Sequence, residues 1–220
     1  MLRLYYHPFA SFCQKALIAF YENGIAFTGE IIDLGDPEQR AALEAVWPMT
    51  KFPVLRDEAR NVTVPEASLV IEYLGNHYPG AVKLVPDDPD SALRVRLLDR
   101  VFDNYVSVPL QKIVVDTFRP EGCGDPHGVE EARVAMTRTY AMLDEELAHD
   151  GWAGGGGFSL ADCAAAPALF YSNMAVPFAG YPHLSAYFER LRARPSFARV
   201  VDEARPYRHL FPLPWPAGYD

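Results

Sequence analysis

The stretch Thr50-Lys51-Phe52-Pro53-Val54-Leu55 decides how the first part of the chain folds. Val54 and Leu55 are typical of the start of a buried strand. Proline has no backbone N–H to give to a sheet ladder, so Pro53 is expected to end a loop and open this strand. The backbone N–H and C=O of Phe52 then have no partner within the chain, and such an edge can bind an extended peptide. A plain loop-to-strand junction would have the same sequence, so the neighbouring elements have to distinguish the two.

The residues before this stretch predict a strand, a helix and a second strand. Residues 2–6 predict the first strand, and His7-Pro8-Phe9-Ala10 breaks it. Ser11 is expected to cap a helix that stops at Gly24. Residues 27–32 predict the second strand. Two strands separated by one helix form a right-handed unit, in which the strands are parallel.

A second helix and a hairpin follow. Asp36 is expected as the N-cap of this helix, with Pro37 in its first turn, and the helix is expected to run to about Val46. Residues 54–56 and 62–64 are separated by a charged turn, so they predict a β-hairpin and an antiparallel pair.

The chain then changes character. Pro65-Glu66 is expected to open a third helix, which gives the order β-α-β-α-β-β-α over residues 1–80. Residues 81–90 form a linker rich in proline and aspartate. Strand signals vanish after it, so residues 91–220 predict an all-helical domain. Its expected helices are residues 91–118, 129–147, 159–178, 183–194 and 195–203.

Composition excludes several classes of protein. Half of the 220 residues are hydrophobic and 22% are charged, which is ordinary for a globular chain. The net charge of −9 argues against nucleic acid and against an anionic membrane as partners. Three widely spaced cysteines and six histidines without ligand spacing suggest no disulfide framework and no metal site. We expect a protein of the reducing cytoplasm, with neither a signal peptide nor a membrane span.

Three features now combine: Ser11 near the first helix N-terminus, Phe52-Pro53 before the third strand, and Glu66-Ala67-Ser68 at the start of the third helix. In this order, and followed by a helical domain, the chain resembles the cytosolic glutathione transferases over nearly all of its length. The resemblance implies a thioredoxin-like first domain and a cis peptide bond before Pro53. It also implies a homodimer that conjugates glutathione, as co-substrate, to small hydrophobic electrophiles, an activity of detoxification.

The same resemblance assigns a glutathione site. The cysteinyl backbone would pair with Phe52, and the γ-glutamyl carboxylate would lie on the N–H groups of Ala67 and Ser68, because a helix N-terminus favours anions. Glu66 would meet the ammonium group. Lys51 is either a contact for the glycyl carboxylate or a solvated loop residue. Ala67 departs from the family's usual Glu-Ser pair, and Ser68 is expected to supply the missing hydroxyl. The full expected set is Phe9, Ala10, Phe12, Lys51, Phe52, Pro53, Glu66, Ala67 and Ser68.

Ser11 is the expected partner of the glutathione thiol. A hydroxyl donor and a helix N-terminus both favour a thiolate over a thiol. Tyr5, Tyr6 and Cys13 are the alternatives, since related enzymes use tyrosine, serine or cysteine near this point. Ser11 as a plain N-cap, and Cys13 as a small buried residue, stay open as structural interpretations.

The helical domain is expected to supply the electrophile pocket and one structural motif. Asn104, Val108 and Gln111 share one helix face, and Tyr105 beside them belongs either to the pocket or to the core. Residues 207–219 are expected either to cover the pocket or to pack along the helices. Ser159 and Asp162 form a capping box with Asp in place of Glu, similar to a box in the sixth helix of these transferases.

Two other functions remain open from the sequence. One is a glutathione-fold binding or scaffold protein without useful catalysis, which the departure at Ala67 favours. The other is a glutathione-dependent thiol oxidoreductase or peroxidase that uses Cys13.

Overall fold

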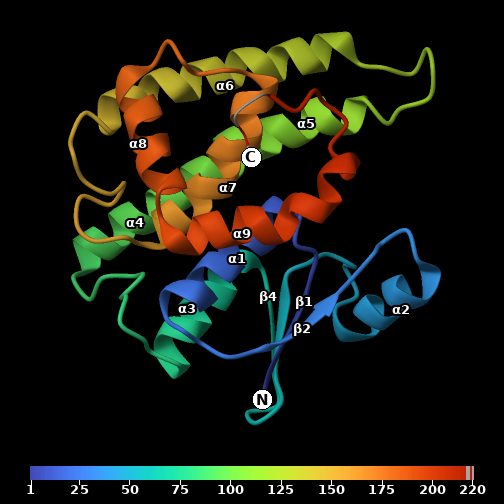
Figure 1. Ribbon diagram of the computed structural model, residues 1–220, viewed down its shortest axis with the longest axis vertical. Coiled ribbons are helices and arrows are strands. Elements are labelled where there is room, and N and C mark those ends of the chain that lie inside the picture. Colours follow the sequence, from blue (N-terminus) through green and yellow to red (C-terminus); the bar gives the residue numbers. More distant parts are fainter. Residues whose placement is uncertain (217–218, 220) are drawn as a thin grey trace.

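A small sheet domain and a larger helical domain lie side by side in the structure, a computed structural model that describes residues 1–216 and residue 219 (Figure 1). The first domain has the predicted order of elements. In the described part of the second domain, all the regular elements are helices. The elements of the first domain are β1 (Leu2–Tyr6), α1 (Ser11–Glu22), β2 (Thr28–Ile31), α2 (Pro37–Val46), β3 (Val54–Asp57), β4 (Val62–Pro65) and α3 (Ala67–His77).

The four strands form one mixed sheet in the order β2-β1-β3-β4. β1 and β2 are parallel, as predicted, and β3 is antiparallel to both β1 and β4. Successive side chains of a strand face opposite sides. Leu4 and Leu55 therefore join the main core with α1 and α3, whereas Val54 packs with Leu43 of α2 on the other face.

Of three local predictions for the first domain, two are confirmed and one is wrong. The prediction for α2 is confirmed, because the Asp36 side chain accepts hydrogen bonds from the amides of Glu38 and Gln39 at 2.9 and 3.3 Å. The cis peptide bond before Pro53 is present. The N-cap prediction for Ser11 is wrong, because α1 begins at Ser11 itself and Ala10 occupies the cap position.

The helical domain begins earlier than predicted. Asp88-Pro89 and Asp125-Pro126 repeat the Asp36-Pro37 signal, with aspartate as the cap and proline in the first turn. α4 and α6 therefore start at these prolines. The elements of the domain are α4 (Pro89–Val101), η1 (Phe102–Ser107), α5 (Val108–Asp116), α6 (Pro126–Glu146), α7 (Leu160–Ala175), α8 (Pro182–Arg192), α9 (Pro195–Ala204) and the 3₁₀ helix η2 (Arg205–Leu210).

The first long helix of this domain is not uniform. The sequence predicted one helix over residues 91–118, but its middle part, η1, is a π-helix. A π-helix has a wider turn than an α-helix, so it changes which residues face the core. Asp103 is buried there, while Asn104 and Tyr105 are exposed.

The helix α7 forms the centre of the second domain and packs against α1 of the first. It begins with the predicted capping box, in which Asp162 accepts hydrogen bonds from the Ser159 amide and hydroxyl, each at 2.8 Å. Asp162 also accepts from the Ala153 amide at 2.9 Å and from the Tyr187 hydroxyl at 2.6 Å. Burial raises the pKa of the Asp162 carboxyl, and these donors oppose that effect. The box thus fixes the entry of α7 and the preceding glycine-rich loop together.

Replacing this carboxylate tests the role of the box. Asp162→Ala is expected to lower the free energy of unfolding by about 3–5 kcal/mol, because several buried donors lose their acceptor at once. Urea denaturation would measure the change. Asp36→Ala, which removes the partly exposed cap of α2, is the control and should cost clearly less. If both variants lost the same free energy of unfolding, the box would stabilise the fold no more than an ordinary helix cap does.

Candidate functional site

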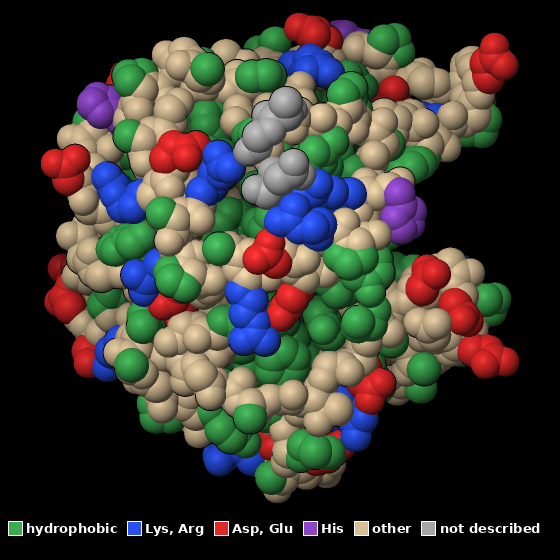
Figure 2. Space-filling model, viewed as in Figure 1, with side chains coloured by type: hydrophobic (Ala, Val, Ile, Leu, Met, Phe, Trp, Pro, Cys, Tyr) green, Lys and Arg blue, Asp and Glu red, His purple; other side chains and the backbone are tan. Residues whose placement is uncertain are grey.

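A cleft with a volume of about 480 Å³ lies between the two domains. The surface is indented on the right of the view between the part that carries α5 and the part that carries α2 (Figure 2). The cleft is lined by predicted site residues from both domains, namely Ala10, Ser11, Phe12, Lys51, Phe52, Pro53, Glu66, Ala67, Val108 and Gln111. Ten predicted residues from four separate stretches of the sequence therefore meet at one surface.

Two helix N-termini face this cleft without a side-chain cap. α1 begins beside Ala10 and α3 begins beside Glu66, and neither residue gives its helix a capping hydrogen bond. The amides of a first helical turn have no partner within the helix, and they carry the positive end of the helix dipole. The cleft is therefore suited to two anionic groups, one at each helix.

The backbone of Phe52 provides the edge that the sequence predicted. Among the described residues, none forms a hydrogen bond with the N–H or C=O of Phe52, and strand pairing starts only at Val54. The Phe52 ring packs on the α2 side of the sheet and stacks near His7, with ring centroids 6.4 Å apart. The ring thus belongs to the fold, and the backbone remains available to an extended ligand.

Two residues of the cleft have a left-handed backbone. Glu66 has a φ of 70° and Thr50 has a φ of 51°, and residues with a side chain rarely adopt such positive values. Such strained positions concentrate at binding sites, where they direct groups toward a ligand. Glu66 in this conformation joins the end of β4 to the first turn of α3.

The candidates for a thiol partner separate clearly by position. Ser11 lines the cleft. Tyr5 packs under α2, and the Tyr6 ring lies against Phe27 with centroids 6.4 Å apart. Cys13 is fully buried, and burial raises the pKa of its thiol. Of these four residues, Ser11 alone faces the cleft.

Ser68 does not line the cleft, in contrast to its predicted role. Its hydroxyl accepts a hydrogen bond from Lys15 Nζ at 2.8 Å, donates to Asp99 Oδ2 at 2.9 Å and also contacts Arg100. It cannot replace the hydroxyl that Ala67 lacks, although its amide stays in the uncapped first turn of α3. No sequence pattern indicated these contacts of Ser68, because its partners come from α1 and α4.

Lys15 is the centre of a buried ionic cluster between the domains, with a side chain that is 1% exposed. Its ammonium lies 2.5 Å from Asp99 Oδ1 and 2.7 Å from Asp103 Oδ2. Arg100 bonds the same two carboxylates from the half-exposed side. Burial raises the pKa of the Asp103 carboxyl, while the charge of Lys15 opposes this shift. The cluster joins α1, α3, α4 and η1 beneath the cleft.

Phe9 and the C-terminal segment pack together away from the cleft. The Phe9 ring contacts Tyr171, Phe211 and Trp215, with centroid separations of 5.4, 6.4 and 6.4 Å. The described part of the segment therefore packs along the helices, and none of its residues lines the cleft. Ala217, Gly218 and Asp220 lie outside the described residues.

Of the four residues predicted for an electrophile pocket, two line the cleft and two do not. Val108 and Gln111 of α5 line the cleft together with the start of α1. Asn104 and Tyr105 do not, and the Tyr105 side chain is 59% exposed, so it is not core either. The π-helical turn of η1 separates the two pairs, and the spacing argument had assumed an α-helix throughout.

Three residues of the cleft were missed by the sequence analysis: Leu34, Trp47 and Thr50. Leu34 and Trp47 flank α2 on either side, so the whole α2 region forms one wall. A tryptophan three residues before Thr50 in a loop was a usable signal, because a large aromatic side chain in a loop needs a surface to cover.

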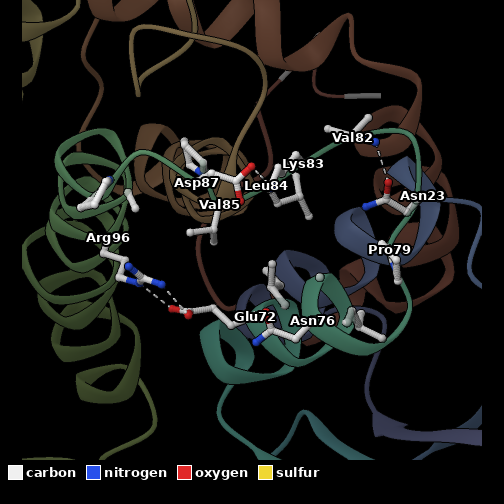
Figure 3. A pocket seen from close by; sticks show the side chains of 17 residues that line it. Asn23, Glu72, Asn76, Pro79, Val82, Lys83, Leu84, Val85, Asp87 and Arg96 are labelled. Atoms are coloured by element: carbon white, nitrogen blue, oxygen red, sulfur yellow. Dashed lines mark hydrogen bonds and ion pairs between the residues drawn. The ribbon is translucent and has the colours of Figure 1, made fainter.

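A second, larger cavity of about 580 Å³ lies between α3, the interdomain linker and the start of α4. Its polar side chains bind one another: Arg96 forms two hydrogen bonds with Glu72, at 2.9 and 2.8 Å, and Asn23 accepts from the Val82 amide at 2.8 Å (Figure 3). The first contact joins α3 to α4 and the second ties the linker to the end of α1, so both have a structural role.

Neither a metal site nor a membrane span is found in the part of the chain that the structure describes. No group of three or more histidine, cysteine, aspartate or glutamate side chains is arranged to hold a metal ion within residues 1–216 and 219. Within the same range, no helix has both the length and the apolar character that a bilayer requires.

Comparisons with known proteins agree with this geometry. Residues 4–81 match the family model of the glutathione S-transferase N-terminal domain, and residues 112–195 match that of the C-terminal domain. The glutathione S-transferase GstB of Escherichia coli (strain K12) is 25% identical over 159 residues, which are 71% of this chain and 76% of that protein. The disulfide-bond oxidoreductase YfcG of the same strain is 30% identical over 81 residues, 36% of this chain and 38% of that protein.

Two solved structures are similar over most of the chain. A glutathione S-transferase from Methylobacillus flagellatus with glutathione bound has a TM-score of 0.84 at 24% identity, covering 91% of this chain and 98% of that one. A glutathione S-transferase from Methylobacterium radiotolerans in complex with glutathione sulfonate has a TM-score of 0.77 at 27% identity, covering 90% and 93%.

Removing the buried cation beneath the cleft should unbalance the ionic cluster. Lys15→Met is expected to lower the free energy of unfolding at neutral pH by about 3–5 kcal/mol, because two buried carboxylates lose their buried counter-ion and keep only the half-exposed Arg100. An acid with a raised folded-state pKa destabilises the fold above that pKa and ceases to do so as the pH falls through it. The loss should therefore shrink at acidic pH, as Asp103 protonates.

Urea denaturation between neutral and acidic pH would measure this dependence. Lys83→Met is the matched control, because Lys83 forms an exposed ion pair with Asp87 and should contribute almost nothing. A loss in Lys15→Met that is independent of pH would contradict the electrostatic interpretation.

Proposed function

Because the chain belongs to the glutathione S-transferase family, we propose that it conjugates the thiol of glutathione to small hydrophobic electrophiles. The observation that carries the proposal is the cleft itself. It brings together the unpaired backbone of Phe52 and the uncapped N-termini of α1 and α3. These three elements match an extended peptide that carries a thiol at its centre and a carboxylate at its γ-glutamyl end.

Each part of glutathione has a counterpart in the cleft. The cysteinyl N–H and C=O pair with the Phe52 backbone as one added strand rung. The γ-glutamyl carboxylate binds the first-turn amides of α3, at Ala67 and Ser68. Glu66 receives the ammonium group, and Lys51 contacts the glycyl carboxylate.

Ser11 acts on the reacting sulfur. Its hydroxyl and the N-terminal end of α1 lower the pKa of the bound thiol, so that the proton leaves to solvent and a thiolate remains. The thiolate sulfur attacks the electrophilic carbon and forms the thioether. The electron pair of the broken bond leaves with the displaced group, or shifts onto the acceptor in an addition.

The apolar walls of the cleft hold the electrophile. Leu34 and Trp47 line one side and Val108 lines the other, while Gln111 is the polar group that the helical domain contributes. Such a mixture of apolar surface and one polar group is typical of small-molecule sites.

A binding protein without turnover is the second candidate, favoured by one observation. Ala67 has no hydroxyl, and the hydroxyl of Ser68 is committed to Lys15 and Asp99. The γ-glutamyl carboxylate then has backbone donors alone, and its affinity falls accordingly. An oxidoreductase using Cys13 has less support, because that thiol is buried and its pKa is raised.

A homodimer completes the proposal. Leu93 and Leu97 lie four residues apart on α4 and share an exposed face, and Leu69 of α3 is also exposed. The Glu72–Arg96 ion pair holds α3 beside α4, so the three leucines belong to one surface. An exposed apolar patch of this kind is typical of an interface, here with a second copy. Three free cysteines fit the reducing cytoplasm as the proposed location.

Ser11→Ala tests the chemistry. The variant is expected to lower kcat for 1-chloro-2,4-dinitrobenzene by about 10- to 100-fold and to raise the pKa of bound glutathione by about 1–2 units. Thiolate absorbance against pH and steady-state rates would measure both. Ser91→Ala, which removes a hydroxyl bound to Asp88 on α4, is the control. Tight glutathione binding by the wild type without turnover would favour the binding protein instead.

Leu97→Glu tests the dimer. The wild type should have twice the chain mass of 24.6 kDa by light scattering, and the variant should shift toward the monomer. Val134→Glu on α6 is the control, because its side chain is 52% exposed against 61% for Leu97 but lies on another helix. A monomeric wild type would show that this surface is not an interface between copies.

A further inference from the structure

The segment between β1 and α1, residues 7–10, has its backbone polar groups hydrogen-bonded almost completely. The Ala10 amide donates to the His7 carbonyl at 3.0 Å, and the Phe9 amide donates to His7 Nδ1 at 3.2 Å. The Ala10 carbonyl accepts from the Gln14 amide at 2.9 Å. Two carbonyls, those of Pro8 and Phe9, have no backbone donor within the segment and depend on side chains.

Those two carbonyls are held by a buried pair of side chains. Gln14 Nε2 donates to the Pro8 carbonyl at 2.9 Å, and the Tyr171 hydroxyl donates to the Phe9 carbonyl at 3.1 Å. Gln14 Nε2 also donates to the Tyr171 hydroxyl at 2.8 Å. Gln14 lies on α1 and Tyr171 lies on α7, so the pair spans the two domains.

The orientation of the pair is determined by its hydrogen bonds. The Pro8 carbonyl needs a donor, so the amide nitrogen of Gln14 must face it. Gln14 Oε1 is then buried without a partner among the described residues. A buried acceptor without a donor is unfavourable, and an apolar side chain of similar size would avoid it. Packing alone therefore does not account for glutamine at this position.

We propose that Gln14 and Tyr171 are positioning residues for the thiol-activating end of α1. They fix the two peptide groups that lead directly into Ala10 and Ser11, and they couple these groups to α7 of the helical domain. This inference rests on the proposed function for its catalytic consequence, but not for its structural one. Gln14 and Tyr171 do not line the cleft, so their action is through the segment that does.

Loss of the pair should loosen the segment without removing any group that touches glutathione. In Tyr171→Phe the Phe9 carbonyl loses its donor, and the ring remains to pack against Phe9. In Gln14→Met the Pro8 carbonyl loses its donor, and the unpaired Oε1 is removed as well. The second variant therefore separates positioning from stability, because removal of the unpaired buried acceptor offsets part of the cost of the lost hydrogen bonds.

Hydrogen exchange of the ligand-free protein tests the structural part. The amides of Phe9 and Ala10 should exchange about tenfold faster in Tyr171→Phe and in Gln14→Met than in the wild type. Tyr140→Phe is the matched control, because Tyr140 is also a buried tyrosine of the helical domain, but its hydroxyl makes no hydrogen bond to this segment. Exchange rates equal to those of Tyr140→Phe would overturn the proposal.

Kinetics and a pH profile test the catalytic part. In both variants kcat should fall about tenfold, and the apparent pKa in the pH profile should rise by about one unit, because Ser11 is less well placed. KM for glutathione should change less than about twofold, since Phe52 and α3 are untouched. A purely structural role would lower the melting temperature and leave the pH profile unchanged.

The two proposals fail in distinguishable ways. If the wild type does not bind glutathione, the proposed function is wrong, while the exchange rates still decide whether the pair holds the segment. If the wild type is active and the variants keep its pH profile, the positioning role is wrong and the proposed function stands.

Discussion

A buried ammonium group between the domains is the constraint on which the rest of the structure depends. Lys15 is almost fully buried, and an isolated cation there would be strongly unfavourable. Asp99 and Asp103 satisfy it from the helical domain, and Ser68 does so from α3. Because Lys15 lies one helical turn after Ser11, the same ionic cluster that joins the domains also fixes the two helix N-termini of the cleft relative to each other.

The cleft owes its character to backbone groups more than to reactive side chains. Two uncapped helix ends and the unpaired edge at Phe52 supply its hydrogen-bonding groups. Backbone donors are present whatever side chain the residue carries, so Ala67 is compatible with an anion site that usually has a hydroxyl.

What could be predicted from the sequence was local chemistry. The cap at Asp36 and the box of Ser159 with Asp162 involve partners within three residues, and both are present. Asp88-Pro89 and Asp125-Pro126 were equally local and were overlooked. The parallel pair of β1 and β2 followed from connection rules, since one helix joins them, whereas the pairing of β1 with β3 was not predicted. The ten cleft residues were found because the family resemblance supplied the long-range arrangement that the pattern itself lacks.

The errors concern side chains whose partners are distant in sequence. The direction of Ser68 is decided by Lys15 and Asp99, 53 and 31 residues away, and that of Phe9 by Tyr171, 162 residues away. No spacing rule contains such information. The predicted positions of Asn104 and Tyr105 were wrong for a different reason. The π-helical turn interrupts the α-helical period from which those positions were predicted. The same turn buries Asp103. The π-helix η1 therefore both displaces Asn104 and Tyr105 from their predicted positions and brings a second carboxylate to Lys15.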